Sequence, residues 1–233
     1  MLSPSEIAAI AADAADRLLV RPREGVPEAR VIRRELSARL KSASGADVVA
    51  VGLAIARTPA LKASRARWVG WELISKHKAA LASLDLAMVE ALGAGNDTWD
   101  EVDGYGTCIA GPAWLHGLIR DEDVIAWTQR EDLWRRRTAL VATVILNSRT
   151  HGGPGDTART FAVTDRLLDD REDMVVKAMS WALRKLSGRD RAAVEAYLSA
   201  NEARLAARVR REVGVKLRTG RKTVRPQKPT PAP

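Results

Sequence analysis

The segment DTWDEVD, residues 97 to 103, gathers four carboxylates and one indole in a chain whose formal net charge is +9. Thr98 followed three residues later by Glu101 has the spacing of a capping box, and a helix dipole favours acid in a first turn. Asp103 lies beyond that turn, four residues after Trp99, so a helix would project the indole and the carboxylate from one face. Either this pair contacts a substrate together, or Trp99 is a core residue and Asp103 pairs with a neighbouring arginine.

A second group of residues lies in DLWRRRTALV, residues 132 to 141. In a helix, Arg135, Arg136 and Arg137 point in three directions, and we expect at least one to face inward or along a groove. The apolar stretch that begins at Ala139 predicts a well-buried helix, which would hold these arginines on a rigid support. A guanidinium fork binds phosphate oxygens bidentately. The alternative is that the three arginines form ion pairs with the acidic band at 121–132.

The third group lies in MVVKAMSWALRKL, residues 174 to 186. Lys177, Trp181 and Arg184 recur at spacings of four and three, opposite an apolar face formed by Val175, Val176, Met179, Leu183 and Leu186. An indole between two cations suits a sugar-phosphate backbone, and we expect the adjacent Lys185 to contact DNA as well. The alternative is a tryptophan packed beneath the stems of Lys and Arg.

Other chemistry is not indicated by the sequence. The histidines and the single Cys108 lack the spacing of metal ligands, so we expect no metal site and no cofactor. GGPGD at 152–156 lacks the Lys-Ser/Thr of a P-loop and follows no strand, which predicts a plain loop. No defensible Ser-His-Asp grouping occurs.

The elements that must position these groups are helices. Ala, Leu, Arg and Glu dominate the composition, and no run of alternating β-branched residues predicts a sheet. Short connections between many helices favour stacked helical pairs over a four-helix bundle. We therefore predict an all-α fold, a degenerate HEAT-like solenoid. Its expected helices are 3–19, 27–42, 46–57, 59–77, 83–93, 98–109, 112–119, 121–129, 131–147, 158–169, 171–187 and 190–218, the last interrupted near Ser199.

Charge is distributed unevenly along the chain. Residues 79–134 hold two basic and eleven acidic residues, whereas residues 208–233 hold nine basic and one acidic. Basic segments suit a polyanion such as DNA or RNA, or they form a solvated face. One cysteine excludes an internal disulfide, the first helix is too charged for a signal peptide, and no apolar run reaches membrane-spanning length. We expect a soluble, cytoplasmic monomer.

In this order, the three groups resemble the DNA alkylation repair family, the AlkD-like DNA glycosylases built from HEAT-like repeats. The resemblance runs from about residue 28 to residue 218 and is strongest in NDTWDEVD, DLWRRRTAL and VVKAMSWALRKLSGRDRAAV. The pattern Lys-Ala-x-x-Trp-Ala-Leu-Arg is its most specific part. The resemblance implies a catalytic carboxylate at Asp103, aromatic walls at Trp99 and Trp181, a DNA-backbone contact at Arg137, and a concave helical surface that works from the backbone side of the DNA.

The resulting prediction is a monofunctional DNA glycosylase that excises cationic alkylated purines of the N3-methyladenine and N7-methylguanine type from double-stranded DNA. The alternative is a non-catalytic helical-repeat protein that binds damaged or branched DNA, or a protein partner. We expect one domain over residues 1–218. The segment TGRKTVRPQKPTPAP, residues 219–233, holds four prolines and four basic residues, which predicts a disordered basic tail.

Overall fold

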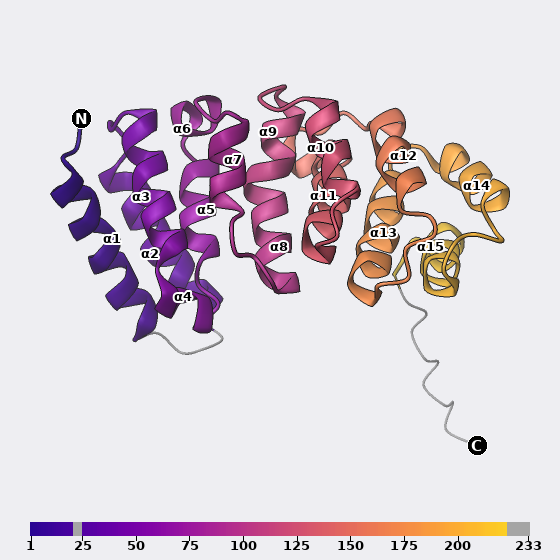
Figure 1. Ribbon diagram of the computed structural model, residues 1–233, viewed down its shortest axis with the longest axis horizontal. Coiled ribbons are helices and arrows are strands. Elements are labelled where there is room, and N and C mark those ends of the chain that lie inside the picture. Colours follow the sequence, from indigo (N-terminus) through magenta and orange to yellow (C-terminus); the bar gives the residue numbers. More distant parts are fainter. Residues whose placement is uncertain (21–24, 223–233) are drawn as a thin grey trace, which may run out of the picture.

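The computed structural model describes residues 1–20 and 25–222, and every regular element among them is a helix. The helices are arranged along the long axis of the molecule, from α1 at one end to α14 and α15 at the other (Figure 1). This confirms the predicted all-α helical-repeat solenoid. The α-helices are α1 Pro4–Leu19, α2 Val26–Arg39, α3 Gly45–Arg57, α4 Pro59–Ala63, α5 Trp68–Ser75, α6 Lys78–Ala82, α7 Leu86–Leu92, α8 Trp99–Tyr105, α9 Gly111–Leu115, α10 Asp121–Thr128, α11 Leu133–Leu146, α12 Thr157–Arg166, α13 Asp173–Leu186, α14 Arg191–Ala200 and α15 Ala207–Thr219.

One continuous row of helices organises the stack. Helix α1 packs on α3, α3 on α5, α5 on α8 and on the turn that follows it, and these on α11, which packs on α13, which packs on α15. The remaining helices pack against members of this row, as α2 does on α1 and α5, and α12 on α11 and α13. A single apolar core runs from Ile10 to Leu217. The predicted functional groups all lie on α8, α11 and α13, which are successive members of the row.

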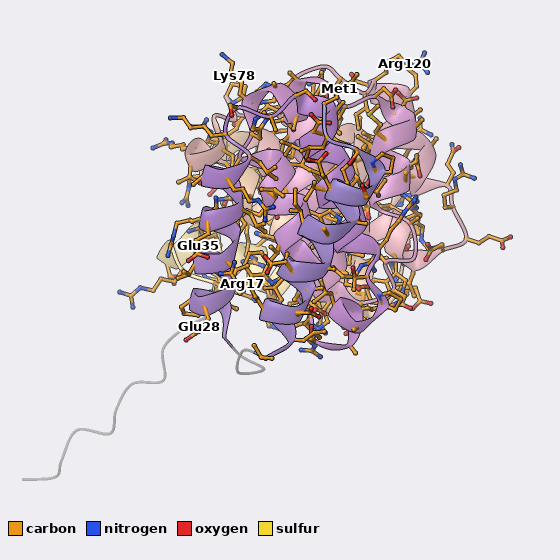
Figure 2. All side chains as sticks on the ribbon, turned by 90° about the vertical axis from the view of Figure 1, so that its left-hand side faces the viewer. Met1, Arg17, Glu28, Glu35, Lys78 and Arg120 are labelled. Carbon is orange, nitrogen blue, oxygen red and sulfur yellow. The ribbon has the colours of Figure 1, made fainter. Side chains whose placement is uncertain are left out.

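The amphipathic patterns and caps predicted most helices within a few residues. Ser3 forms a capping box with Glu6, and Asp190 caps the start of α14. At the N-terminal end of the stack, Arg17 of α1 forms an ion pair with Glu35 of α2, as Figure 2 shows. The predicted interruption of 190–218 is confirmed by the break between α14 and α15. The basic tail lies outside the described residues from 223 onward.

The single helix predicted over 59–77 is wrong, because the chain divides it into α4 and α5. The Ala66 N–H donates to the Leu61 carbonyl at 2.8 Å and the Arg65 N–H to the Lys62 carbonyl at 3.1 Å, which is the hydrogen bonding of a Schellman motif. Arg65 takes the left-handed position of that motif, with φ of 55°. The prediction failed because glycine is the residue that usually marks this position. Helix α6 was also not predicted; His77 caps it by accepting a hydrogen bond from the Ala80 N–H at 3.1 Å.

The break predicted between 98–109 and 112–119 is also wrong. Helix α8 continues into α9 through one π-helical turn, Gly106–Ala110. Pro112 has no N–H to donate, and its ring would clash with the carbonyl four residues earlier in a regular helix. The wider turn, closed by the Gly111 N–H on the Gly106 carbonyl, lets the helix pass this proline without ending.

The loop after α11 is held by specific hydrogen bonds and caps the end of that helix. The Asn147 side chain donates to the hydroxyl of Thr160 at 2.8 Å and accepts from the Asp156 N–H at 3.0 Å. A Cβ at Gly153 would lie 2.2 Å from the Ile145 carbonyl oxygen, so only glycine fits there. This loop therefore ties α11 to α12. Over the part of the chain that the structure describes, no helix has both the length and the apolar character needed to cross a membrane.

Candidate active site

A cleft of about 440 Å³ opens where α8, α11, α13 and α15 lie side by side. Trp99, Asp103, Arg137 and Trp181, which the sequence singled out on three separate segments, all line it. The structure thus brings four residues from up to 82 positions apart (99 to 181) to one site. The full lining is Trp99, Asp103, Arg137, Met174, Lys177, Trp181, Arg184, Arg208, Glu212 and Lys222.

Asp103 and Arg137 form a bidentate ion pair in the cleft. Arg137 Nη2 donates to Oδ1 at 2.8 Å and to Oδ2 at 3.0 Å, and Nε donates to Oδ1 at 3.1 Å. Arg137 Nη1 also donates to the Met174 carbonyl, which fixes the guanidinium between α8 and α13. The Arg137 side chain is 6% exposed and that of Asp103 is 21% exposed. The guanidinium therefore holds the carboxylate in one orientation while leaving it open to the cleft.

The ionisation of Asp103 reflects two opposing effects. Burial raises the pKa of Asp103 above its ordinary value, whereas the charge and hydrogen bonds of Arg137 lower it. The sequence left open that Asp103 pairs with a neighbouring arginine, and in the structure it pairs with Arg137. Trp99, by contrast, is no core residue, since 49% of it is exposed.

A buried ion pair positions the helix that carries Trp99 and Asp103. Glu101, between them on α8, accepts a hydrogen bond from Arg67 Nη1 at 2.9 Å, and both side chains are below 10% exposed. Arg67 also donates to the Ala56 carbonyl at 2.5 Å, and Glu101 accepts from the Asp97 N–H at 3.2 Å. Thr98 makes no side-chain cap, so the predicted capping box of Thr98 and Glu101 is wrong. Glu101 instead joins α8 to the preceding repeat.

Helix α13 presents the polar face that the sequence predicted. Val175, Leu183 and Leu186 are buried, whereas Lys177, Trp181 and Arg184 line the cleft. Lys177 forms an ion pair with Asp173 at 2.6 Å. The Trp181 indole is half-buried against the core and turns its remaining surface to the cleft.

Helix α15 supplies cleft residues that the sequence did not single out. Glu212 accepts a hydrogen bond from the hydroxyl of Ser180 at 2.7 Å and lies 3.8 Å from Arg184. Arg208, one turn earlier, pairs with Asp173 at 2.8 Å. Only the packing of α15 on α13 brings these residues to the cleft; the four-residue spacing of Arg208 and Glu212 was the only signal in the sequence.

Three predicted DNA-binding residues do not line the cleft. Arg135 pairs with Glu90 at 2.8 Å, and Arg136 pairs with Asp170 at 2.7 Å and donates to two nearby carbonyls. The ion-pair partners of the two arginines, Glu90 on α7 and Asp170 in the loop before α13, both lie outside the acidic band at 121–132 that the sequence suggested. Lys185 lies on the next face of α13. Their contacts with DNA stay predictions.

The described residues contain no group of three or more His, Cys, Asp or Glu side chains that could hold a metal ion. Cys108 lies on the π-helical turn, and burial, with a smaller effect of Glu72, raises the pKa of its thiol to about 11. The thiol is therefore protonated at neutral pH and is a poor nucleophile.

A family model described as "DNA alkylation repair enzyme" matches residues 26–217. The chain belongs to the DNA alkylation repair enzyme family. No curated protein and no solved structure matches the chain. Membership of this repair family implies that the protein binds DNA and has a role in the repair of alkylated DNA, and the matched residues include every residue of the cleft except Lys222.

Proposed function

We propose that this DNA alkylation repair enzyme is a monofunctional DNA glycosylase that hydrolyses the N-glycosidic bond of cationic alkylated purines. One observation supports the proposal most directly: an exposed indole, a held carboxylate, a buried arginine and a second indole converge on one cleft. Such a cleft combines a negative charge with a surrounding surface that attracts a polyanion.

The chemistry of the substrate explains why a carboxylate is needed. Alkylation at N3 or N7 makes the purine a cation and a good leaving group. Departure of the base then develops positive charge on the deoxyribose. Asp103 stabilises this oxocarbenium-like sugar electrostatically and orients the water that adds to it, as carboxylates do in glycoside hydrolysis. The base leaves as a neutral purine and an abasic sugar remains in the DNA.

Arg137 and the two indoles support that carboxylate. The bidentate pair keeps both Asp103 oxygens in place, which preorganises the site before the charge develops. Trp99 and Trp181 frame the sugar and exclude bulk water. The resemblance assigns Arg137 a contact with the phosphate beside the lesion, and Arg137 is one of the residues that line the cleft.

The cleft carries the charge that double-stranded DNA requires. Its lining holds five basic side chains (Arg137, Lys177, Arg184, Arg208, Lys222) and two carboxylates (Asp103, Glu212). Five minus two leaves a formal excess of +3 around the catalytic carboxylate, which draws the phosphate backbone toward it. No lysine is required as a nucleophile, because water is the attacking group. The product should therefore be an intact abasic site.

The substitution Asp103→Asn tests the proposal. It keeps the shape of the side chain and an oxygen that can accept from Arg137, but it removes the charge. We expect release of N3-methyladenine and N7-methylguanine from methylated duplex DNA to fall by about 100-fold or more, which is the usual effect of losing one electrostatic catalytic group. Single-turnover base release, measured with saturating enzyme, is the assay.

The matched control is Asp97→Asn, which removes a carboxylate from the same segment but from an exposed ion pair with Lys62 outside the cleft. Its base release should equal that of the wild-type protein. Full activity of Asp103→Asn would exclude the proposed mechanism. If the wild-type protein binds methylated DNA and releases no base, the protein is the non-catalytic binder that the sequence left as the alternative.

A further inference from the structure

A second pocket, of about 550 Å³, lies on the neighbouring face of α8. Trp99 and Asp103 point into the cleft, whereas Asp100, Gly104 and Thr107 line this second pocket together with residues of α2 and α5. Gly104 directly follows Asp103, so the second pocket lies beside the cleft on α8. The lining also includes Arg30, Arg65, Trp68 and Glu72.

The mouth of the pocket holds a residue under backbone strain. Arg65 is the one non-glycine residue with positive φ in the described chain. A left-handed conformation is unfavourable for an L-residue, and glycine would occupy this Schellman position without that cost. The Arg65 side chain is 61% exposed and lies 3.9 Å from Asp100. Strain of this kind collects at functional sites, and here it holds a cation at the pocket mouth.

The interior of the pocket offers hydrogen-bond acceptors and an indole. Glu72 Oε2 and Asp100 Oδ1 are buried and accept no hydrogen bond within the described chain. The nearest cation to Glu72 Oε2 is Arg33 Nε, at 3.8 Å, which is beyond hydrogen-bond distance. Trp68 is half-buried and lines the pocket together with both carboxylates. A buried carboxylate oxygen without a donor is costly, so a turn of either carboxylate toward a ligand that brings N–H groups would relieve that cost.

We propose that this second pocket binds one unpaired nucleotide of the DNA that occupies the cleft. Arg65 and Arg30, both exposed at the mouth, contact its phosphate. Trp68 stacks on the base, and Glu72 and Asp100 accept hydrogen bonds from the exocyclic amino group of adenine or cytosine. The volume of the pocket is ample for one nucleotide. The proposal rests on DNA binding in the cleft but not on base excision there.

Binding to unmethylated duplexes tests the pocket without any catalytic step. Three duplexes are compared at one salt concentration by fluorescence anisotropy: fully paired, with one bulged adenine, and with one bulged thymine. We expect the wild-type protein to bind the adenine bulge about tenfold more tightly than the paired duplex, since stacking of one base on an aromatic side chain contributes a gain of this order. The thymine bulge, which lacks an amino group, should bind more weakly than the adenine bulge.

Two variants locate the preference. Trp68→Leu should bind paired DNA as the wild type does and lose the preference for the bulge. Arg65→Gly relieves the backbone strain, so its melting temperature should be equal or higher while its preference for the bulge falls. Arg65→Gly decides the question alone if Trp68→Leu does not fold. The matched control is Trp134→Leu, which removes a half-buried indole outside both pockets and should keep the preference.

Several outcomes would overturn the proposal. They are a wild-type protein without a preference for the bulge, a preference that survives in both pocket variants, or an equal loss of affinity for paired and bulged DNA. Failure of the proposed function looks different, because methylated DNA would then release no base while the preference for the bulge persists.

Discussion

At the scale of single residues, the central feature is the carboxylate of Asp103, whose pKa is set by two opposing effects. Burial raises the pKa of Asp103 and Arg137 lowers it. The proposed reaction needs the ionised form, so the rate of base release should rise with pH through the pKa of Asp103 and then level off. Because this pKa is raised, the acidic limb of the profile should lie above the ordinary value of 3.8.

The substitution Arg137→Gln should move this acidic limb to higher pH. The variant removes the group that lowers the pKa of Asp103 and leaves the burial that raises it. Single-turnover base release measured from acidic to neutral pH gives the position of the limb. Lys177→Gln is the control, since Lys177 is a cleft cation that pairs with Asp173 and not with Asp103. A limb that stays in place or moves to lower pH in Arg137→Gln would show that another group controls the reaction.

At the scale of elements, the position of α8 depends on the buried pair of Arg67 and Glu101. Arg67 reaches back to the Ala56 carbonyl of α3, lies 5.5 Å from the ring centre of Trp71, and holds Glu101 on α8. This one side chain therefore connects three successive helices of the row. Trp99 and Asp103 lie at the start of the continuous helix that α8 forms with α9, and the pair of Arg67 and Glu101 anchors that end of it.

Removing either partner of this pair should destabilise the protein strongly. Glu101→Leu or Arg67→Met leaves one buried charge without its partner, and we expect each to lower the free energy of unfolding by about 3–5 kcal/mol. The double variant should lose less than the sum of the two single losses, because no buried charge remains unpaired. Denaturant unfolding of the four proteins gives these values. Strictly additive losses would mean that the two side chains do not act as a pair.

At the scale of the whole molecule, positive charge is concentrated at the C-terminal end of the chain, where residues 208–233 hold nine basic residues and one acidic residue. Helix α15 and the residues after it bring Arg208 and Lys222 to the cleft, and the sequence continues with Arg225 and Lys228. Cations of this kind add affinity that does not depend on sequence and that weakens with salt.

Truncation after Lys222 should therefore flatten the salt dependence of DNA binding. Each phosphate contact contributes about 0.9 to the slope of log affinity against log salt, so loss of Arg225 and Lys228 should reduce the slope by up to about 1.8. Single-turnover base release should change little, since the cleft stays complete. Arg225→Ala/Lys228→Ala in the full chain is the control that separates charge from length. An unchanged slope in both proteins would mean that these residues do not contact the DNA.

Much of this protein follows from local rules that act on the sequence. Helix propensity, apolar periodicity and capping residues predicted the all-α stack, and the spacing of four between Trp99 and Asp103 predicted their shared face. The same rules failed at Arg65, at Pro112 and at Glu101. At Arg65 a left-handed residue ends a helix without glycine, and at Pro112 a π-helical turn lets the helix continue. At Glu101 an ion pair with the distant Arg67 replaces the predicted local cap.

The tertiary structure alone decided which of the predicted residues act together. The sequence does not distinguish Arg135, Arg136 and Arg137. Only Arg137 of the three lines the cleft, because α11 packs between α8 and α13. Only the packing of the helices showed that Arg208 and Glu212 line the cleft and that Arg65 lines the second pocket. The sequence determined the elements and the chemistry that each one carries. The packing of helix on helix determined the sites, because a site is a set of distances between segments that no local pattern encodes.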